Sequence, residues 1–255
     1  MASAKGSPGV TTTAWVLASV WPTDVILVDG DAAGGDLALL GRTPERGVLD
    51  PDRGLLSLAA DARRGLAEGA VGEHLQRLGG GLDVLCGVAS PDQMTGIGPV
   101  WPALAGVFAD LSDADVIVDC GRIVPGTPVM PVVSAADVLV MVARPHLESF
   151  AHLRERLRWL AHLRQSLGHG PAVGVVVISE PGDKRSAQDL TQLLARDGLA
   201  ASVLGGVAQD QRAADVVAGR LDRGIDRSLL VRSVRQLVEP VRALAATGAP
   251  THVTD

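Results

Sequence analysis

The sequence predicts an α/β fold built on a doubly wound, mostly parallel sheet. Continuous apolar runs recur along the chain, which is typical of parallel strands that are buried on both faces. Stretches with helical periodicity separate these runs, and the alternation indicates βαβ units with right-handed crossovers. The expected strands cover residues 25–28, 82–86, 115–119, 137–143, 173–178 and 200–210.

The segments between these strands show helical periodicity or turn residues. Residues 11–20 open on threonine and carry an apolar stripe, which predicts a first helix. Residues 90–99 contain glycine and proline and are expected to form a loop. The remaining helices are expected at residues 54–64, 68–78, 100–111 and 149–167.

Composition limits the class of protein. Of the 255 residues 47% are apolar, so we expect one domain over residues 1–247 and a disordered tail over 248–255. A net charge of −6 and only 2% aromatic residues argue against general or sequence-specific nucleic-acid binding. Two cysteines are too few for a disulfide scaffold, which predicts a reducing, cytoplasmic location.

Residues 5–12, with the sequence KGSPGVTT, are similar to a phosphate-binding loop. The standard loop, G-x-x-x-x-G-K-[ST], surrounds phosphate with backbone N–H groups, while its lysine pairs with the β/γ-phosphates and its hydroxyl binds Mg²⁺. In this alignment Ala4 and Gly9 take the glycine positions, Val10 the lysine position and Thr11 the magnesium position. Because Val10 carries no charge, the loop keeps the shape of a nucleotide site without its central cation. An ordinary surface turn is the alternative interpretation.

The same segment resembles the deviant Walker A motif, K-G-G-x-G-K-[ST]-[ST], of the ParA/MinD family of dimerising ATPases. Lys5 stands at the position of the signature lysine, which in the family reaches the nucleotide of the partner subunit. The resemblance continues in order to about residue 220 and includes a D-x-D segment at Asp29 and Asp31 and a Walker B-like strand that ends at Asp119. It implies the same doubly wound sheet and a degenerate P-loop.

The resemblance also implies roles for individual residues, with ATP and Mg²⁺ as cofactors. Lys5 and Asp31 are the catalytic candidates, Asp31 by orienting the attacking water. The implied magnesium ligands are Thr11, Asp29 and Asp119. The implied nucleotide contacts are Lys5, Gly6, Ser7, Gly9, Thr11, Thr12, Ser179 and Asp210. Two of these residues have simpler interpretations, Thr11 as a helix N-cap and Asp31 as a turn residue.

The segment before the loop is unusual. In proteins that the chain resembles, an apolar strand near the centre of the sheet leads into the P-loop. Only four residues, MASA, precede Lys5 here, too few and too small to form that strand. A missing central strand would leave buried backbone groups of its neighbours unpaired. The first strand is therefore expected to be truncated, with the true start upstream, or missing from a remodelled sheet, and we favour truncation because the downstream elements are intact.

Residues 226–246 form the last informative segment. Leucines and valines repeat there at helical spacing with interleaved arginines, and Pro240 interrupts the pattern. Two interpretations are open, a basic amphipathic helix that binds membranes and a terminal helix that packs on the sheet. We favour the second.

Three functions remain open at this point. The first is an ATP-switched homodimer that positions cellular cargo such as the chromosome, the septum or secretion and pilus machinery, with impaired hydrolysis. The second is a non-hydrolysing pseudo-ATPase that serves as a scaffold for a protein partner. The third is a metabolic ligase of the same superfamily. The sequence does not identify the cargo or the protein partner.

Overall fold

The computed structural model describes residues 1–6, 8–65, 69–221 and 224–248. Its strands are hydrogen-bonded in the orders β3-β4-β2-β5 and β1-β6-β7-β8, and every neighbouring pair is parallel except β3 with β4. The strands are β1 (Ala2–Ser3), β2 (Val25–Asp29), β3 (Gln76–Arg77), β4 (Asp83–Leu85), β5 (Asp115–Asp119), β6 (Val138–Ala143), β7 (Ala172–Ser179) and β8 (Ser202–Ala208). The predicted parallel sheet is confirmed.

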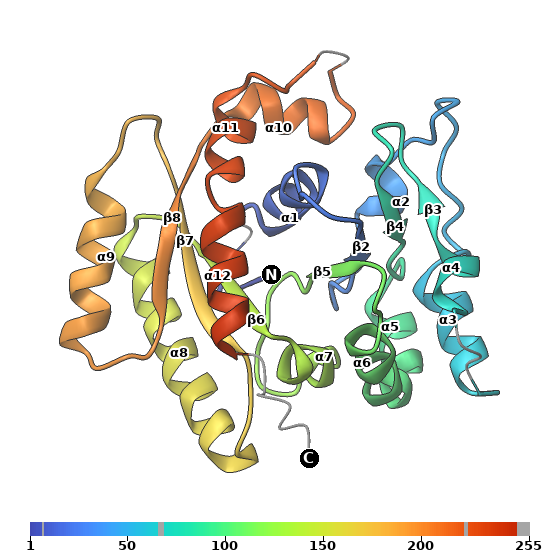
Figure 1. Ribbon diagram of the computed structural model, residues 1–255, viewed down its shortest axis with the longest axis horizontal. Helices are drawn as coiled ribbons and strands as arrows, with labels where there is room; N and C mark the ends of the chain where they lie inside the picture. Colours follow the sequence, from blue (N-terminus) through green and yellow to red (C-terminus); the bar gives the residue numbers. More distant parts are fainter. Residues whose placement is uncertain (7, 66–68, 222–223, 249–255) are drawn as a thin grey trace.

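Residues 1–3 join the two groups of strands. On one side, Ala2 and Ser3 pair with Met141 and Val142 of β6. On the other side, the Ser3 N–H donates to the Gly121 carbonyl at 2.8 Å, and the Cys120 N–H donates to the Met1 carbonyl at 2.9 Å. The N-terminus therefore lies in the middle of the molecule, between β5 and β6 (Figure 1). The first strand is short, as expected, yet its few residues occupy the central position.

Helices cover both faces of the sheet, so the doubly wound arrangement is also confirmed (Figure 1). Strand β6 shows this directly, because Met141 packs in one apolar cluster and Val140 and Val142 pack in the other. The helices are α1 (Val10–Ser19), α2 (Leu37–Leu40), α3 (Leu55–Ala62), α4 (Val71–His74), α5 (Pro91–Ile97), α6 (Trp101–Ala109), α7 (Met130–Ala135), α8 (Leu147–Leu167), α9 (Arg185–Arg196), α10 (Gln211–Val217), α11 (Leu229–Arg235) and α12 (Val238–Gly248).

Two segments differ from the sequence-based expectation. The expected loop at 90–99 contains helix α5, which Ser90 caps by accepting a hydrogen bond from the Gln93 N–H at 3.4 Å. Serine followed by proline is a helix start signal, so this helix was predictable. The expected helix at 68–78 is instead the short α4 followed by β3, because a turn at Leu78, closed by the Leu82 carbonyl at 2.9 Å, folds the chain back on β4. Residues 66–68 and the tail at 249–255 lie outside the described residues.

The C-terminal segment forms two helices rather than one interrupted helix. Pro240 lies in the first turn of α12, where a proline costs no helical hydrogen bond. The apolar side chains of both helices are buried among α1 and the strands, namely Leu230, Val231, Val234, Leu237, Val238 and Val241. Because this face is already covered, the segment packs on the sheet as a terminal helix pair. Within the described residues, no helix combines the length and apolar character needed to cross a membrane.

The role of β1 can be tested by placing a charge in it. The Ala2 side chain is fully buried between the two halves of the sheet. We expect Ala2→Asp to lower the free energy of unfolding by about 3 kcal/mol or more, because its carboxylate would have no partner there. Urea unfolding measures this loss. Ser202→Asp, at an exposed position at the start of the outer strand β8, is the control and should change stability little. Equal losses in the two variants would contradict the central placement of β1.

Candidate functional site

The carboxyl ends of the parallel strands meet at one edge of the sheet, and α1 begins there. Gly9 precedes α1 in a left-handed conformation with φ 108°, and a Cβ atom at this position would approach Ile178 Cδ1 to 3.1 Å. Gly9 is therefore required for the loop to enter the helix. Gly6 also has a positive φ, 72°, and faces open space. Ser7, an expected nucleotide contact, lies outside the described residues.

A cleft with two lobes flanks the start of α1. The first lobe, about 760 Å³, lies beside Gly6, Val10, Asp31, Gly121 and Arg122. The second lobe, about 270 Å³, lies against the ends of β7 and β8. Both lobes share four lining residues, namely Gly9, Thr11, Thr12 and Asp36. The segment from Gly9 to Thr12 thus forms a ridge between two adjacent spaces, which is a suitable shape for a nucleotide whose phosphates lie at a helix N-terminus.

Asp29, at the end of β2, is buried and organises the next segment. Its Oδ2 accepts a hydrogen bond from the Leu37 N–H at 2.9 Å, and its Oδ1 accepts one from the Asp31 N–H at 3.5 Å. Gly35 and Gly87 enclose the carboxyl so closely that a Cβ atom at either position would overlap it. Burial, followed by the neighbouring Asp119, raises the pKa of Asp29 to about 7. Both oxygens have backbone partners, so the structure places this residue as an anchor of residues 31–37.

Asp119, at the end of β5, is also buried but is not fully satisfied. Its Oδ1 accepts the Gly121 N–H at 2.9 Å, whereas its buried Oδ2 has no hydrogen-bond partner among the described residues. Burial raises its pKa, and the nearby Thr11 hydroxyl and the Gly121 N–H lower it. A buried carboxylate oxygen without a partner is costly unless a cation or proton completes it. Asp119 and Thr11 therefore fit a magnesium ion at this point.

Thr11 lies in the first turn of α1 and does not cap the helix. The cap is Gly9, and α1 begins at Val10, one residue earlier than expected. The N-cap interpretation of Thr11 is therefore wrong. Thr13 uses its hydroxyl to bond the Gly9 carbonyl at 2.7 Å, which holds the first turn closed. Thr11 is left facing the first lobe and Asp119.

Asp31 is half-buried at the mouth of the first lobe. Its Oδ1 accepts the Ala33 N–H at 2.8 Å, which is the turn geometry proposed as its simpler role. Burial raises the pKa of Asp31, and the cation of Arg122 lowers it. Gly121, with φ 55°, lies directly against this carboxyl, so a Cβ atom at 121 would overlap it. Asp31 therefore stabilises a turn and also lines the first lobe of the cleft.

The two positions of the loop at which the family carries a lysine, here Lys5 and Val10, differ in exposure. Val10 is 5% exposed and packs in the apolar cluster of α1, although it also borders the first lobe. Lys5 is exposed, and its Nζ lies 3.1 Å from His152 Nε2 on α8. Lys5 lines neither lobe. Its expected catalytic and nucleotide-binding roles therefore stay predictions.

The second lobe is formed by the residues that follow three neighbouring strands. Arg144 follows β6 and donates from Nη1 to Gln209 Oε1 at 2.9 Å, and the Gln209 N–H donates to the Ser179 carbonyl at 2.8 Å. Asp210 lines the lobe but uses its carboxylate to cap α10 through the Ala213 N–H. Ser179 is buried at the end of β7 and lines neither lobe. Arg144 and Gln209 were missed from the sequence, although Arg144 directly follows the predicted strand 137–143; Gln209 falls inside the predicted strand 200–210, which ends at Ala208 in the structure.

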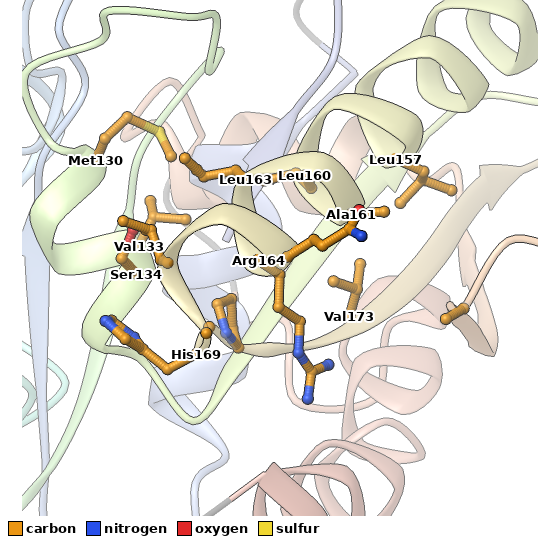
Figure 2. Close-up of a pocket in the computed structure, with 16 residues that line it drawn as sticks. Met130, Val133, Ser134, Leu157, Leu160, Ala161, Leu163, Arg164, His169 and Val173 are labelled. Carbon is orange, nitrogen blue, oxygen red and sulfur yellow. The ribbon is translucent and has the colours of Figure 1, made fainter.

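A separate pocket of about 490 Å³ lies at the opposite end of the sheet, where β7 begins. Apolar side chains of α7 and α8 line it, among them Met130, Val133, Leu160 and Leu163 (Figure 2). Arg164 and His169 are its charged or titratable residues. The pocket contains no carboxylate and lies away from α1, so it is no part of the nucleotide-shaped cleft.

Comparisons with known proteins identify the fold. No protein-family profile matches the chain, and no curated protein sequence matches it. Among solved structures, a ParA family ATPase from Chlorobium tepidum TLS matches at a TM-score of 0.70 and 17% identity, over 94% of this chain and 96% of that one. The cell division ATPase MinD from Pyrococcus furiosus matches at 0.70 and 18% identity, over 95% and 97% of the two chains.

A third solved structure shows the breadth of this fold. Cobyrinic acid a,c-diamide synthase from Mycobacterium smegmatis, with a bound ATP analog and magnesium, matches at a TM-score of 0.68 and 18% identity, over 97% and 96% of the two chains. The chain therefore has the ParA/MinD-like P-loop NTPase fold. Because this fold carries both a cell division protein and a metabolic enzyme, the function has to be argued from the site.

The raised pKa of Asp29 gives a pH-dependent stability. Between pH about 4 and about 7 the folded state holds a proton that the unfolded state releases, so the free energy of unfolding falls as pH rises through this window. Asp29→Asn removes this titration. Between pH 4 and pH 8, the free energy of unfolding of the variant should therefore rise relative to that of the unmodified protein by about 4 kcal/mol at most. Urea unfolding across this range measures the difference. A constant difference would show that the carboxyl is not perturbed.

The contact between Gly121 and Asp31 can be tested by a matched pair of variants. Gly121→Ala and Gly126→Ala both place alanine at a positive φ, 55° and 85°, but only the first overlaps a side chain. We expect Gly121→Ala to push the Asp31 carboxyl into solvent, so that its pKa falls toward the ordinary value. A carboxyl ¹³C NMR titration measures this. Gly126→Ala should leave the pKa of Asp31 unchanged, and a similar change in both variants would contradict the assigned contact.

Proposed function

We propose that this protein is a ParA/MinD-like nucleotide switch that binds a magnesium nucleotide in the two-lobed cleft and hydrolyses it slowly. The observation that carries the proposal is the buried Asp119, whose unpartnered Oδ2 lies with the Thr11 hydroxyl at the N-terminus of α1. A helix N-terminus, a hydroxyl and an acidic strand end are the parts that a magnesium nucleotide site needs. Mg²⁺, when bound, supplies the positive charge that neighbouring phosphate oxygens require.

Different residues of the chain would contact different parts of the nucleotide. The N–H groups at the start of α1 belong to the ridge between the lobes and can donate to phosphate oxygens. The second lobe, with Arg144 and Gln209 at its wall, offers a space for the base and ribose. Asp31 lies on the phosphate side, where it can orient a water molecule.

Slow hydrolysis follows from Val10. Backbone N–H groups are fixed and can hold phosphates in the ground state, but they follow the charge that develops during phosphoryl transfer less well than a lysine does. Loss of one such transition-state contact costs roughly 3–4 kcal/mol. We therefore expect turnover orders of magnitude below that of a site with the P-loop lysine.

The biological role that the fold favours is spatial positioning. Two of the structures described above are a ParA family ATPase and a cell division ATPase. We propose a homodimer that forms with bound nucleotide and positions a cargo, such as the chromosome, the septum or secretion and pilus machinery, through a protein partner. Lys5 is exposed and lies outside its own cleft, in contact with His152, and we propose that it approaches the second subunit of the dimer.

A second candidate function, a scaffold that does not hydrolyse nucleotide, has its own support. Val10 is packed in the apolar core, so the loop is stable without an anion. Burial also raises the pKa values of Asp29, Asp31 and Asp119, so protons can replace a metal ion in reducing their repulsion. Such a protein would keep the fold and its partner surface without a nucleotide cycle.

Restoring the cation tests the proposal. We expect Val10→Lys to tighten binding of a fluorescent ATP analogue about tenfold in the presence of Mg²⁺, because the ammonium would reach the phosphates. Turnover should rise as well, provided that Asp31 and Asp119 are intact. Fluorescence titration and phosphate release measure the two effects. Val10→Met is the control for disturbed packing, because methionine is similar in length to lysine and carries no charge. It should increase neither the affinity nor the turnover.

The results separate the two functions. Magnesium-dependent binding by the unmodified protein, with slow turnover that Val10→Lys accelerates, supports the switch. Absence of binding in both the unmodified protein and Val10→Lys, with native melting temperatures, would reject the switch and leave the scaffold. Rapid turnover in the unmodified protein that Lys5→Ala abolishes would show that Lys5 supplies the missing charge, and would refute slow hydrolysis.

A further inference from the structure

The first lobe of the cleft has one cationic side chain in its wall, Arg122, which the family resemblance did not point to. Arg122 directly follows Gly121, and its backbone forms a parallel bridge with Ser3 at the end of β1. The side chain is exposed, and its charge lowers the pKa of Asp31. It therefore stands between the acidic residues of the cleft and solvent.

The charge of Arg122 acts on a second arginine, which lies on another element. Arg156, on α8, has its pKa lowered by burial and then by the charge of Arg122. Its buried Nε has no hydrogen-bond partner in the described part of the chain, and its guanidinium lies 5.0 Å from the centroid of the Trp159 ring. The charge of Arg122 thus acts on Arg156, and no ion pair within 4.0 Å joins either arginine to a described carboxylate.

The other arginines in the middle of α8 are paired. Arg154 and Arg158 both form ion pairs with Glu155 and with Asp197, at distances of 2.8–3.9 Å. The acidic partners Glu155 and Asp197 therefore pair with the arginines on the face of α8 that points toward α9. The face that points toward the P-loop carries cations without such partners.

Two further basic residues extend this face. His152 precedes Arg156 by four residues on α8, so the two side chains are neighbours on one side of the helix. Its Nε2 lies 3.1 Å from the Nζ of Lys5, at the start of the P-loop. Lys5 therefore contacts His152, His152 neighbours Arg156 on the helix, and the charge of Arg122 at the wall of the cleft acts on Arg156.

We infer that Arg122, in the wall of the first lobe, binds the terminal phosphates of a nucleoside triphosphate in the same chain's cleft. Arg156, His152 and Lys5, which together with Arg122 are here called the basic cluster, add positive charge beside it from outside the lobe. The cluster would replace the charge that is absent at Val10. This inference rests on the proposed function and deepens it by naming the cations. Like charges that converge without acidic partners repel each other, and a polyphosphate anion removes that repulsion while giving the guanidinium groups bidentate partners.

The cluster can be tested with inorganic tripolyphosphate and a fluorescent ATP analogue as separate probes. We expect Arg122→Gln to weaken both by roughly tenfold, since it removes a charge-assisted hydrogen bond. Arg156→Gln should weaken both to a smaller extent, and Arg122→Lys should recover part of the loss. Arg158→Gln, on the same helix but paired with Glu155 and Asp197, is the matched control and should bind like the unmodified protein. Melting temperatures establish that each variant is folded.

Each outcome decides between the inference and the function on which it rests. Tripolyphosphate binding that depends on Arg122, without binding of the ATP analogue, would support the cluster and reject the nucleotide switch. Binding of the ATP analogue that is equal in Arg122→Gln and Arg158→Gln would support the switch and overturn the cluster. Binding of neither probe would overturn both. Two further results would overturn the assignment to the same chain's nucleotide. One is Arg122-dependent binding that appears only at protein concentrations where dimers form. The other is that Arg122→Gln loses binding to duplex DNA alone and keeps binding to both probes.

Discussion

The hydrogen bonds that hold β1 between β5 and β6 are the constraint on which the cleft depends. Residues 1–3 bond to β6 on one side and to the chain around Cys120 on the other, so two four-stranded groups share one carboxyl edge. The loop after β1 therefore leaves the sheet beside Asp119, and α1 begins between the two groups. The first lobe lies beside the ends of β2 and β5 and the second lobe against the ends of β7 and β8, as expected of a cleft at a switch point of a parallel sheet.

Charge balance is the second constraint on this site. Asp119 and Asp31 raise the pKa of Asp29, Asp31 raises that of Asp119, and no lysine lines the cleft within the described residues. A proton on one carboxyl and a metal ion beside another relieve the same repulsion, so the two compete. Under the proposed function, nucleotide affinity and protonation would therefore be linked here more strongly than in a site whose lysine neutralises the phosphates.

The sequence was sufficient for the fold because buried parallel strands read as apolar runs, and six of these runs contain strands of the structure. It was less informative where a short element depends on a distant contact. Strand β3 exists because it can pair with β4, and no local pattern marks it. The acidic residues of the cleft were predictable because they end strands. Arg122 and Arg156 were not, because their proximity arises from two elements that only the folded chain brings together.

Binding and hydrolysis make different demands on this site, and the structure separates them. The Asp29 carboxyl accepts the N–H groups of both Asp31 and Leu37, so it ties the segment with the candidate water-orienting residue to the first turn of α2. Asp119, which contributes to the pKa of Asp29, lies at the position where a metal ion would bind. Occupation of the cleft would therefore change the charge of Asp29 and the hold on residues 31–37 without any bond cleavage. A protein with Val10 in the lysine position can thus respond to a nucleotide even when it turns the nucleotide over slowly.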